Sequence, residues 1–584
     1  MRAKGRPQTQ LFLSPPPSHL TSEDPMCGIF ASLSRQQHVH PDRGTAQFLD
    51  NRGPDCCHAL ERTIDAAARV HAVFRSTVLA LRGSSVVAQP LLDHASGSVL
   101  CWNGEAWEID QEPVTGNDSQ AVLELFQDAC GRDLPNSASA VVDCISRIRG
   151  PYAFVFYDAI GHRLFYGRDC LGRRSLLQST NDAGDFVLSS ICDGHVSSSW
   201  REVEADGIYM VDLDASISTT FHVTHIPYLH AGTNDVARQA LVLPYPPLNR
   251  AVSTSPPVLA EESSPVHSLR DHLTRSLKLR LRNEMPPVHG GKQDQSLARI
   301  AVLFSGGLDC TVIARLAHKI LPYSEPVDLL NVAFENPRIH RPHTDKSGSE
   351  YSPYELCPDR ITGRASYAEL CEVCPERAWR FVEINVPYVE TLAHRDVVIA
   401  LMHPHNTEMD LSISYALYFA SRGSGTVKEL AGQQVEYATP ARILLSGLGA
   451  DELFAGYQRH ATAFSRNGFS GLVDELELDI NRLGKRNLGR DDRVISNWGK
   501  EVRFPYLDEQ LLSWALQAPV WEKTGFGQDS SRGEMMEPGK KVLRLLAWTL
   551  GMRGVAAEKK RAIQFGARTA KMEAGKVKGT QAIK

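Results

Sequence analysis

The sequence predicts two successive domains of different fold class: an α+β sandwich followed by an α/β domain with a parallel sheet. Residues up to about His225 contain short apolar runs separated by turn residues, such as 151–158 and 163–167, a pattern typical of neighbouring strands. After about residue 265, apolar strands alternate with helical repeats and glycine-rich loops, which favours parallel strands covered by helices. A chain of 584 residues is also too long for a single hydrophobic core.

A proline-rich stretch marks the expected boundary between the domains. Prolines cluster within residues 226–264, where few apolar positions repeat, so this stretch is predicted to be an extended linker. The first domain is therefore expected over 26–225 and the second over 265–570. A helix is predicted to start after Ser264-Pro265, with one apolar face formed by Val266, Leu269, Leu273 and Leu277. Residues 571–584 are polar and lysine-rich and are expected to be a disordered tail.

The composition argues against several classes of partner. The chain is 42% hydrophobic and 22% charged with a net charge of −5, so it has neither a broad basic field for nucleic acid nor a polybasic membrane anchor. No apolar run approaches the roughly 18 residues of a membrane span. Twelve cysteines without a secretory signal indicate mostly free thiols in a reducing compartment. We therefore expect a cytoplasmic enzyme that acts on small molecules, and a homodimer is one assembly that the sequence leaves open.

The tetrapeptide Met26-Cys27-Gly28-Ile29 contains the candidate nucleophile, Cys27. A thiol is strongly nucleophilic, and a cysteine at the start of a chain carries a free α-amine that can serve as the base. With residues 1–25 attached, that nitrogen is an amide and is not basic. The expectation is that Met26 is the true start and residues 1–25 are a non-native extension or a disordered leader, with proteolytic removal as the alternative. Taken alone, this short motif is consistent with Cys27 being a buried structural thiol.

Further short motifs follow Cys27 in order: Arg52-Gly53-Pro54-Asp55, Gln89-Pro90-Leu91, Asn103-Gly104-Glu105, Asn117-Asp118-Ser119 and Gly167-Arg168-Asp169 with Gly172. With these residues the chain resembles the class II glutamine amidotransferases, as joined to a synthetase domain in glutamine-hydrolysing asparagine synthetases. The resemblance implies an N-terminal-nucleophile (Ntn) hydrolase sandwich for the first domain. It also implies that Asn103 and Gly104 form an oxyanion hole, with Glu105 beside them, and that Asp118 binds the α-amine of glutamine.

One position departs from that family. Counted back without gaps from Gln89, the arginine that would hold the glutamine carboxylate falls on Val78, which has no donor. Loss of a bidentate Arg–carboxylate pair is expected to weaken glutamine binding substantially. Arg75 or Arg82 is the expected replacement.

Two glycine-rich loops suggest a nucleotide site. Ser305-Gly306-Gly307-Leu308-Asp309 follows the apolar strand 300–304, and Ser446-Gly447 opens a second loop after another strand, 442–445. Glycines let backbone N–H groups approach phosphate oxygens at a helix N-terminus, and Asp309 is a candidate ligand for Mg²⁺. Taken alone, the first loop is also consistent with a capped turn.

The two loops together resemble the ATP site of the same synthetases. The resemblance implies an α/β ATP-pyrophosphatase domain (adenine nucleotide α-hydrolase-like) that uses ATP and Mg²⁺. It also implies that Phe304, Val332, Ser446 and Gly447 line the AMP pocket, and that Ser305, Gly306 and Gly307 bind ATP through its phosphates. Asp309 and Asp451 are the implied metal carboxylates. Lys560 is the candidate for neutralising pyrophosphate, although a solvated basic turn explains it equally well.

A second departure is Leu448, where asparagine synthetases have a glutamate that is thought to deprotonate the attacking ammonium. Leucine cannot accept a proton, whereas adenylation depends on other groups. With both departures the chain looks most like the asparagine synthetase domain-containing branch. Three hypotheses follow: glutamine-dependent amidation of aspartate, the same chemistry with another acceptor, or a non-catalytic nucleotide-binding regulatory protein.

Overall fold

The computed structural model describes residues 27–583 with twelve gaps: 54, 66–68, 83–84, 131–136, 195–199, 215–219, 232–240, 282–296, 340–351, 430–431, 529–535 and 573–577. The expected leader 1–25, Met26, Pro54 of its motif, and parts of the expected linker and tail lie outside the described residues.

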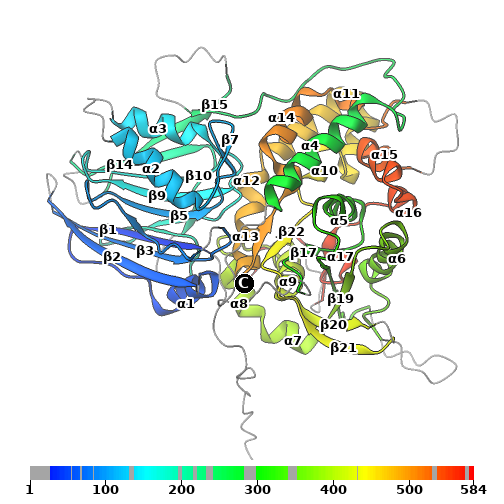
Figure 1. Cartoon of the computed structure of the whole chain (residues 1–584), viewed down its shortest axis with the longest axis horizontal. Coiled ribbons are helices and arrows are strands. Elements are labelled where there is room, and N and C mark those ends of the chain that lie inside the picture. Colours follow the sequence, from blue (N-terminus) through cyan, green and yellow to red (C-terminus); the bar gives the residue numbers. More distant parts are fainter. Residues whose placement is uncertain are drawn as a thin grey trace, which may run out of the picture.

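The first domain is built on two stacked sheets, drawn in blue and cyan in Figure 1. The first sheet is antiparallel, in the order β13 (Arg201–Glu202), β11 (Leu177–Thr180), β12 (Phe186–Ser189), β1 (Gly28–Ser34), β3 (Val70–Val78), β2 (Cys56–Ile64). The second has the order β16 (Leu241–Val242), β15 (Val223–Leu229), β14 (Gly207–Asp212), β10 (Arg163–Arg168), β9 (Tyr152–Asp158), β5 (Val99–Gly104), β4 (Leu91–Leu92). A small sheet consists of β7 (Glu112–Pro113), β6 (Glu108–Ile109) and β8 (Ile148–Arg149).

Side chains from both sheets share one core, which makes the pair a sandwich. Ile29 and Phe74 of the first sheet pack in the same cluster as Val155 and Leu164 of the second. Helices α2 (Asp118–Cys130) and α3 (Ser137–Arg147) cover the other face of the second sheet, and α1 (Arg43–Arg52) packs against β1 and β3. Cys27 directly precedes β1, so the sheet fixes its position. The strands predicted from the short apolar runs are present, and the α+β sandwich that the resemblance implies for the first domain agrees with this arrangement.

The second domain contains one seven-stranded sheet. Its order is β21 (Gln434–Ala438), β20 (Ser424–Lys428), β19 (Trp379–Val386), β18 (Val327–Phe334), β17 (Ile300–Leu303), β22 (Ile443–Leu445), β23 (Glu501–Arg503). The strands from β19 to β23 in this order are parallel, as predicted, whereas β20 and β21 form an antiparallel hairpin at one edge. The sheet is therefore mixed, because β20, which follows α9 (Glu408–Arg422), runs antiparallel to β19.

The remaining helices surround this sheet (Figure 1). They are α4 (Ser264–Arg280), α5 (Leu308–Ile320), α6 (Pro358–Val373), α7 (Tyr388–Ala393), α8 (Arg395–Met402), α10 (Ala450–Leu453), α11 (Gln458–Ile480), α12 (Leu483–Arg486), α13 (Leu488–Ser496), α14 (Glu509–Gln517), α15 (Lys541–Thr549), α16 (Arg553–Ala557) and α17 (Ile563–Gly566). Helix α4 begins where predicted and buries its four predicted apolar residues. None of the helices in the described part of the chain combines the length and apolar character needed to cross a bilayer.

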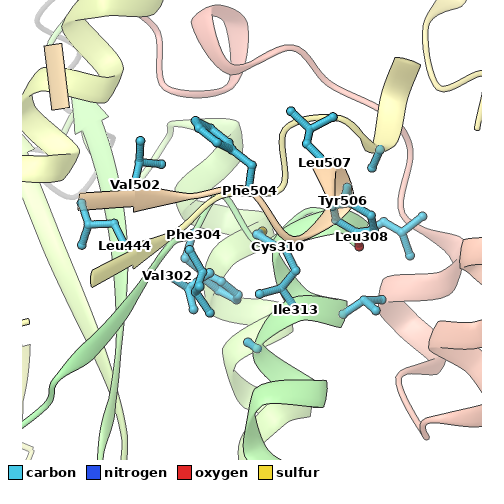
Figure 2. Packing of buried hydrophobic residues seen from close by; sticks show 14 of the residues in the cluster. Val302, Phe304, Leu308, Cys310, Ile313, Leu444, Val502, Phe504, Tyr506 and Leu507 are labelled. Carbon is cyan, nitrogen blue, oxygen red and sulfur yellow. The ribbon is translucent and has the colours of Figure 1, made fainter. Parts of the chain in front are cut away.

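A hydrophobic core fixes the loops that follow the central strands. Figure 2 shows Phe304 after β17, Cys310 and Ile313 along α5, and Phe504 and Tyr506 after β23. These side chains are at most 5% exposed, and the Tyr506 hydroxyl donates to the Asp309 carbonyl at 3.1 Å. The glycine-rich loops are thus held at the carboxyl ends of parallel strands, where ligands bind in such sheets.

Two segments differ from the sequence expectation. The start of the predicted linker forms β15 and β16, because residues 223–229 pair with β14 despite Pro227. Residues 578–583 of the predicted disordered tail pack on the start of α9 instead: Ala582 forms a bridge with Thr407, and Ile583 N–H donates to the Asn406 carbonyl at 2.7 Å. Backbone pairing, which composition does not reveal, accounts for both differences.

Buried ion pairs join the two domains. Arg52 contacts Asp492 at 2.9 Å, Arg174 contacts Glu501 at 2.8 Å, and Arg503 contacts Glu105 at 2.8 Å. All of these side chains are at most 6% exposed. Such pairs are stable only when both partners are present, because either charge alone is costly to bury.

Candidate functional site

Cys27 lines a small cavity of about 30 Å³ at the edge of the sandwich. Its Sγ accepts a hydrogen bond from the Leu79 N–H at 3.4 Å, and its carbonyl accepts one from Arg52 Nε at 3.3 Å. Burial, reinforced by the nearby carboxylates, raises the pKa of the Cys27 thiol to about 12, although the Leu79 hydrogen bond opposes this. The group is therefore a thiol at neutral pH and needs a base before it can attack.

Asn103 and Gly104 stand where an oxyanion hole is expected. With the Asn103 amide oriented to satisfy its neighbours, Nδ2 donates to the Cys27 carbonyl at 3.1 Å and the oxygen accepts from Arg52 Nη2 at 3.3 Å. Gly104 has φ +149°, and a Cβ there would lie 2.1 Å from the Pro151 carbonyl oxygen, so only glycine fits. The structure thus brings Cys27, Asn103 and Gly104 together.

Two carboxylates line the same cavity. Asp118 accepts hydrogen bonds from Ala106 N–H at 2.8 Å and Trp102 Nε1 at 3.1 Å, and burial raises its pKa. Glu105 pairs with Arg503 of the second domain, yet burial outweighs that pair and raises the pKa of Glu105 to about 8. Asp118 is the better-fixed candidate for binding an amine, because backbone and indole donors hold one of its oxygens in place.

Arg82, and not Arg75, reaches the pocket that Val78 leaves without a cation. Arg82 lines the cavity beside Val78, with Nη1 at 3.0 Å from the Ala106 carbonyl and 3.4 Å from Glu105. Arg75 points elsewhere and pairs with Asp50 at 2.5 Å. A cavity of about 30 Å³ holds roughly one water, so an amino acid can enter only if side chains that line the cavity move.

A larger cavity of about 500 Å³ opens where the two glycine-rich loops meet. A Cβ on Gly447 would lie 2.8 Å from the Cβ of Asp309, so the loops touch. All but one of the predicted nucleotide residues line this cavity: Phe304, Ser305, Gly307, Asp309, Val332, Ser446, Gly447, Asp451 and Lys560. Gly306 does not; it has φ +80° and packs against α6, where Ser366 Oγ donates to its carbonyl at 2.6 Å.

Asp309 and Asp451 share a lysine that sequence reasoning missed. Lys540 Nζ lies 2.7 Å from Asp309 Oδ2 and 2.6 Å from Asp451 Oδ1, and Lys560 also pairs with Asp451. Burial alone would raise the pKa of Asp451, but the two lysines outweigh it and hold that pKa well below its usual range. The centre therefore combines two carboxylates with two lysine side chains.

This donor set fits Mg²⁺ bound together with phosphates. Magnesium sites in phosphate chemistry commonly use one or two carboxylates plus substrate oxygens, and here Asp309 and Asp451 line the same cavity. Among the described residues no group of three or more His, Cys, Asp or Glu side chains could hold a metal by itself. Asp309 and Asp451 would hold the ion only with nucleotide oxygens completing its coordination.

Asp359 is a further acidic residue in this cavity that the motifs do not include. It lies in the first turn of α6, is 9% exposed and pairs with Arg561 at 3.9 Å. Burial raises the pKa of Asp359 from its usual 3.8 to about 7, against the lowering effect of Arg561 and Lys560.

We expect Asp359→Asn to reduce the dependence of stability on pH. Between about pH 4 and 7 the folded protein keeps a proton on Asp359 that the unfolded chain releases, so the free energy of unfolding falls as pH rises. An amide cannot ionise, and the variant should gain up to about 4 kcal/mol relative to the parent at pH 8. Denaturant unfolding of both proteins at pH 5 and pH 8 measures the difference. An equal pH dependence of the free energy of unfolding in the two proteins would contradict the raised pKa of Asp359.

Leu448 lines the cavity as an apolar side chain packed against the core. Glu452 lies near it in the chain, but its Oε1 accepts from the Tyr457 hydroxyl at 2.6 Å, and burial raises its pKa. Glu452 is therefore held by Tyr457 and does not replace the glutamate that asparagine synthetases have at the position of Leu448.

Arg503 connects the two cavities. Its side chain pairs with Glu105 beside the thiol, and its carbonyl accepts from the Ser446 N–H of the nucleotide loop at 3.0 Å. Glu501, two residues earlier on β23, also lines the cavity of Cys27. A single short strand of the second domain thus contacts both sites.

The site residues that the sequence analysis missed differ in how visible they are in the sequence. Lys540 precedes Lys541 in a Gly-Lys-Lys run, and its left-handed φ of +59° was unforeseeable. Glu501 and Arg503 carry no local motif.

Comparison with known proteins agrees with both halves of the site. Residues 26–241 match the glutamine amidotransferase domain family, and residues 467–579 match the asparagine synthase family. Asparagine synthetase domain-containing protein 1 of Bos taurus is 36% identical, over 94% of this chain and 96% of its own. A domain-containing protein of Saccharomyces cerevisiae is 33% identical over 83% and 82%. Asparagine synthetase [glutamine-hydrolyzing] 1 of the same yeast is 23% identical over 85% and 77%. With two sites joined through one strand and relatives alike along nearly the whole length, this chain belongs to the asparagine synthetase domain-containing proteins.

Proposed function

We propose that the protein is a glutamine-dependent, ATP-consuming ligase that amidates a carboxylic acid through an acyl-adenylate. The observation that supports this most strongly is the pairing of two cavities: one holds Cys27 with Asn103 and Gly104, and the other holds Asp309 and Asp451 with Lys540 and Lys560. The substrates proposed are glutamine, ATP and a small acid, and Mg²⁺ is the proposed cofactor.

In the first cavity, Sγ of Cys27 attacks the side-chain amide carbon of glutamine and the C–N bond breaks. Its proton passes to the leaving nitrogen through the α-amine of Cys27, which requires that this residue be the first of the mature chain. Asn103 and the Gly104 N–H stabilise the tetrahedral oxyanion. Water then hydrolyses the γ-glutamyl thioester to glutamate.

In the second cavity, a carboxylate oxygen of the acid attacks the α-phosphorus of ATP, and pyrophosphate leaves with the electron pair of the broken P–O bond. Lys540 and Lys560 are placed to neutralise charge on the leaving group. Mg²⁺, when bound, would supply further charge neutralisation between the phosphates. Ammonia then displaces AMP and forms the amide. Arriving as NH₃ from the first cavity, it needs no base before attack, so Leu448 in place of glutamate is compatible with transfer.

Aspartate is the first acid to test, because the similar yeast enzyme is named for asparagine. A different acceptor remains the second form of the proposal, and Leu448 in the cavity wall is the observation in its favour. The alternative of a non-catalytic nucleotide-binding protein predicts ATP binding without exchange.

We test this with a chain whose first residue is Cys27. The parent should release glutamate from glutamine and support ATP–pyrophosphate exchange with at least one acid of a panel of aspartate, glutamate, succinate and butyrate. Cys27→Ala should abolish glutamate release and preserve exchange, whereas Asp309→Ala should do the opposite. Absence of exchange with every acid by a protein that binds ATP would overturn the ligase proposal and favour the non-catalytic alternative.

A further inference from the structure

The large cavity continues beyond the nucleotide loops into a second region, here called the acceptor lobe, between α9, α11, α12 and α13. Its apolar lining includes the side chains of Ile413, Leu417, Leu448 and Leu483. Because Leu448 belongs to the nucleotide loop that also contains Asp451, an acid bound against this wall would lie beside the phosphates. The wall offers hydrocarbon contacts to the middle of that acid.

The carboxylates that line the acceptor lobe are already occupied. Asp491 pairs with Arg490 at 2.7 Å, and Glu452 accepts from the Tyr457 hydroxyl at 2.6 Å. Asp479 accepts from His460 Nε2 at 2.9 Å and also pairs with Arg459. An ammonium group entering the lobe would find no carboxylate without a partner, and burying it unpaired is costly.

Two polar side chains of the lobe are unengaged. Arg482 and Asn487 both line the cavity and are half-buried. Among the described residues, neither the guanidinium of Arg482 nor the amide of Asn487 has a hydrogen-bond or ion-pair partner. Arg490, by contrast, is saturated by Asp410 at 2.6 Å and by Asp491. Among the described side chains of the acceptor lobe, the charge left without a partner is therefore positive, and an arginine fork is suited to a carboxylate.

We propose that the acceptor is a dicarboxylic acid with a hydrocarbon middle and no free amine, and that Arg482 with Asn487 holds the carboxylate that does not react. This deepens the ligase proposal and depends on it. The other carboxylate attacks the α-phosphorus of ATP and is then amidated, so the product is the monoamide of the diacid. Aspartate carries an ammonium that this lobe leaves without a counter-charge.

Three matched acids test the inference by ATP–pyrophosphate exchange. Succinate has two carboxylates and no amine, aspartate adds the amine, and butyrate replaces the second carboxylate with a methyl group. We expect kcat/KM for succinate to exceed that for aspartate and for butyrate by about 10-fold or more, the usual effect of a charge-assisted hydrogen bond. Arg482→Ala should raise KM for succinate by about 10- to 100-fold with little change in kcat, and should leave butyrate unchanged.

Control variants distinguish a loss of carboxylate binding by Arg482 from misfolding of the variant and from failure of the ligase proposal. Lys485→Ala removes a cation three residues along, which pairs with Glu204 and lines a different cavity, and should leave the ranking of acids intact. If Arg482→Ala does not fold, Arg482→Gln tests the same charge, and a non-hydrolysable ATP analogue with each acid gives a thermal-shift readout without turnover. Exchange that prefers aspartate, or an Arg482 variant that affects succinate and butyrate equally, overturns the acceptor assignment alone. No exchange with any acid overturns both proposals.

Discussion

Lys540→Met should reduce ATP–pyrophosphate exchange by about 10²- to 10³-fold, the scale on which removal of one preorganised charge-stabilising donor slows an enzyme. The lysine links Asp309 and Asp451, at 2.7 Å and 2.6 Å. Without it, the two carboxylates repel each other and the leaving pyrophosphate loses a counter-charge. Exchange measured at saturating ATP, together with glutamate release from glutamine, gives the result; only exchange should fall.

Two further variants sharpen the experiment on Lys540. Lys540→Arg keeps the charge but spreads it over a planar fork, so partial activity is expected. Lys428→Met removes an exposed lysine of β20 and should change nothing. Exchange by Lys540→Met within about threefold of the parent, a difference below 1 kcal/mol, would show that Lys560 alone serves the phosphates.

At pH 9, where Glu105 is ionised, Arg503→Met should destabilise the protein by about 3–5 kcal/mol, the usual result of removing one partner from a buried ion pair. Arg503 is 3% exposed and contacts Glu105 at 2.8 Å and Glu501 at 2.6 Å. The variant leaves Glu105 beside the thiol without its main counter-charge, so Glu105 must take up a proton or remain buried and charged. Denaturant unfolding at pH 6 and pH 9 should show the larger loss at pH 9.

A double variant and a surface control make the prediction on Arg503 specific. Adding Glu105→Gln removes one uncompensated charge and should restore part of the stability, as a double-mutant cycle would measure. Arg250→Ala breaks exposed pairs with Asp474 and Glu477 and should have little effect. If Arg503→Met and Arg250→Ala unfold at the same denaturant concentration, the buried pair does not stabilise the interface.

The sequence predicted those parts of the site that are local in the chain. Gly447 and Asp309 belong to loops whose strand, glycines and helix are contiguous, so their meeting at one sheet edge follows from parallel topology. Cys27, Asn103 and Asp118 were recognisable because each stands in a short motif. Their proposed roles still await the experiments above.

Other parts were not predictable, for identifiable physical reasons. Lys540 reaches Asp309 only because its own backbone is left-handed and α15 packs nearby, whereas in the sequence it cannot be told from Lys541. The sequence named Arg75 and Arg82 together, and only the fold separates them, because Arg75 pairs with Asp50 whereas Arg82 lines the cavity. The pairing of Thr407 with Ala582 is backbone hydrogen bonding, which leaves no signature in a lysine-rich tail.

The ion pairs between Arg52, Arg174 or Arg503 and their acidic partners have a consequence for how the whole molecule melts. Each of these charges is buried against a partner in the other domain, so the loss of one partner inside the joined molecule leaves the other charge buried and uncompensated. The two domains are therefore expected to depend on each other for stability. On heating, the two domains should unfold in a single cooperative transition. A substitution of one interface charge should be tolerated only together with a compensating substitution of its partner in the other domain.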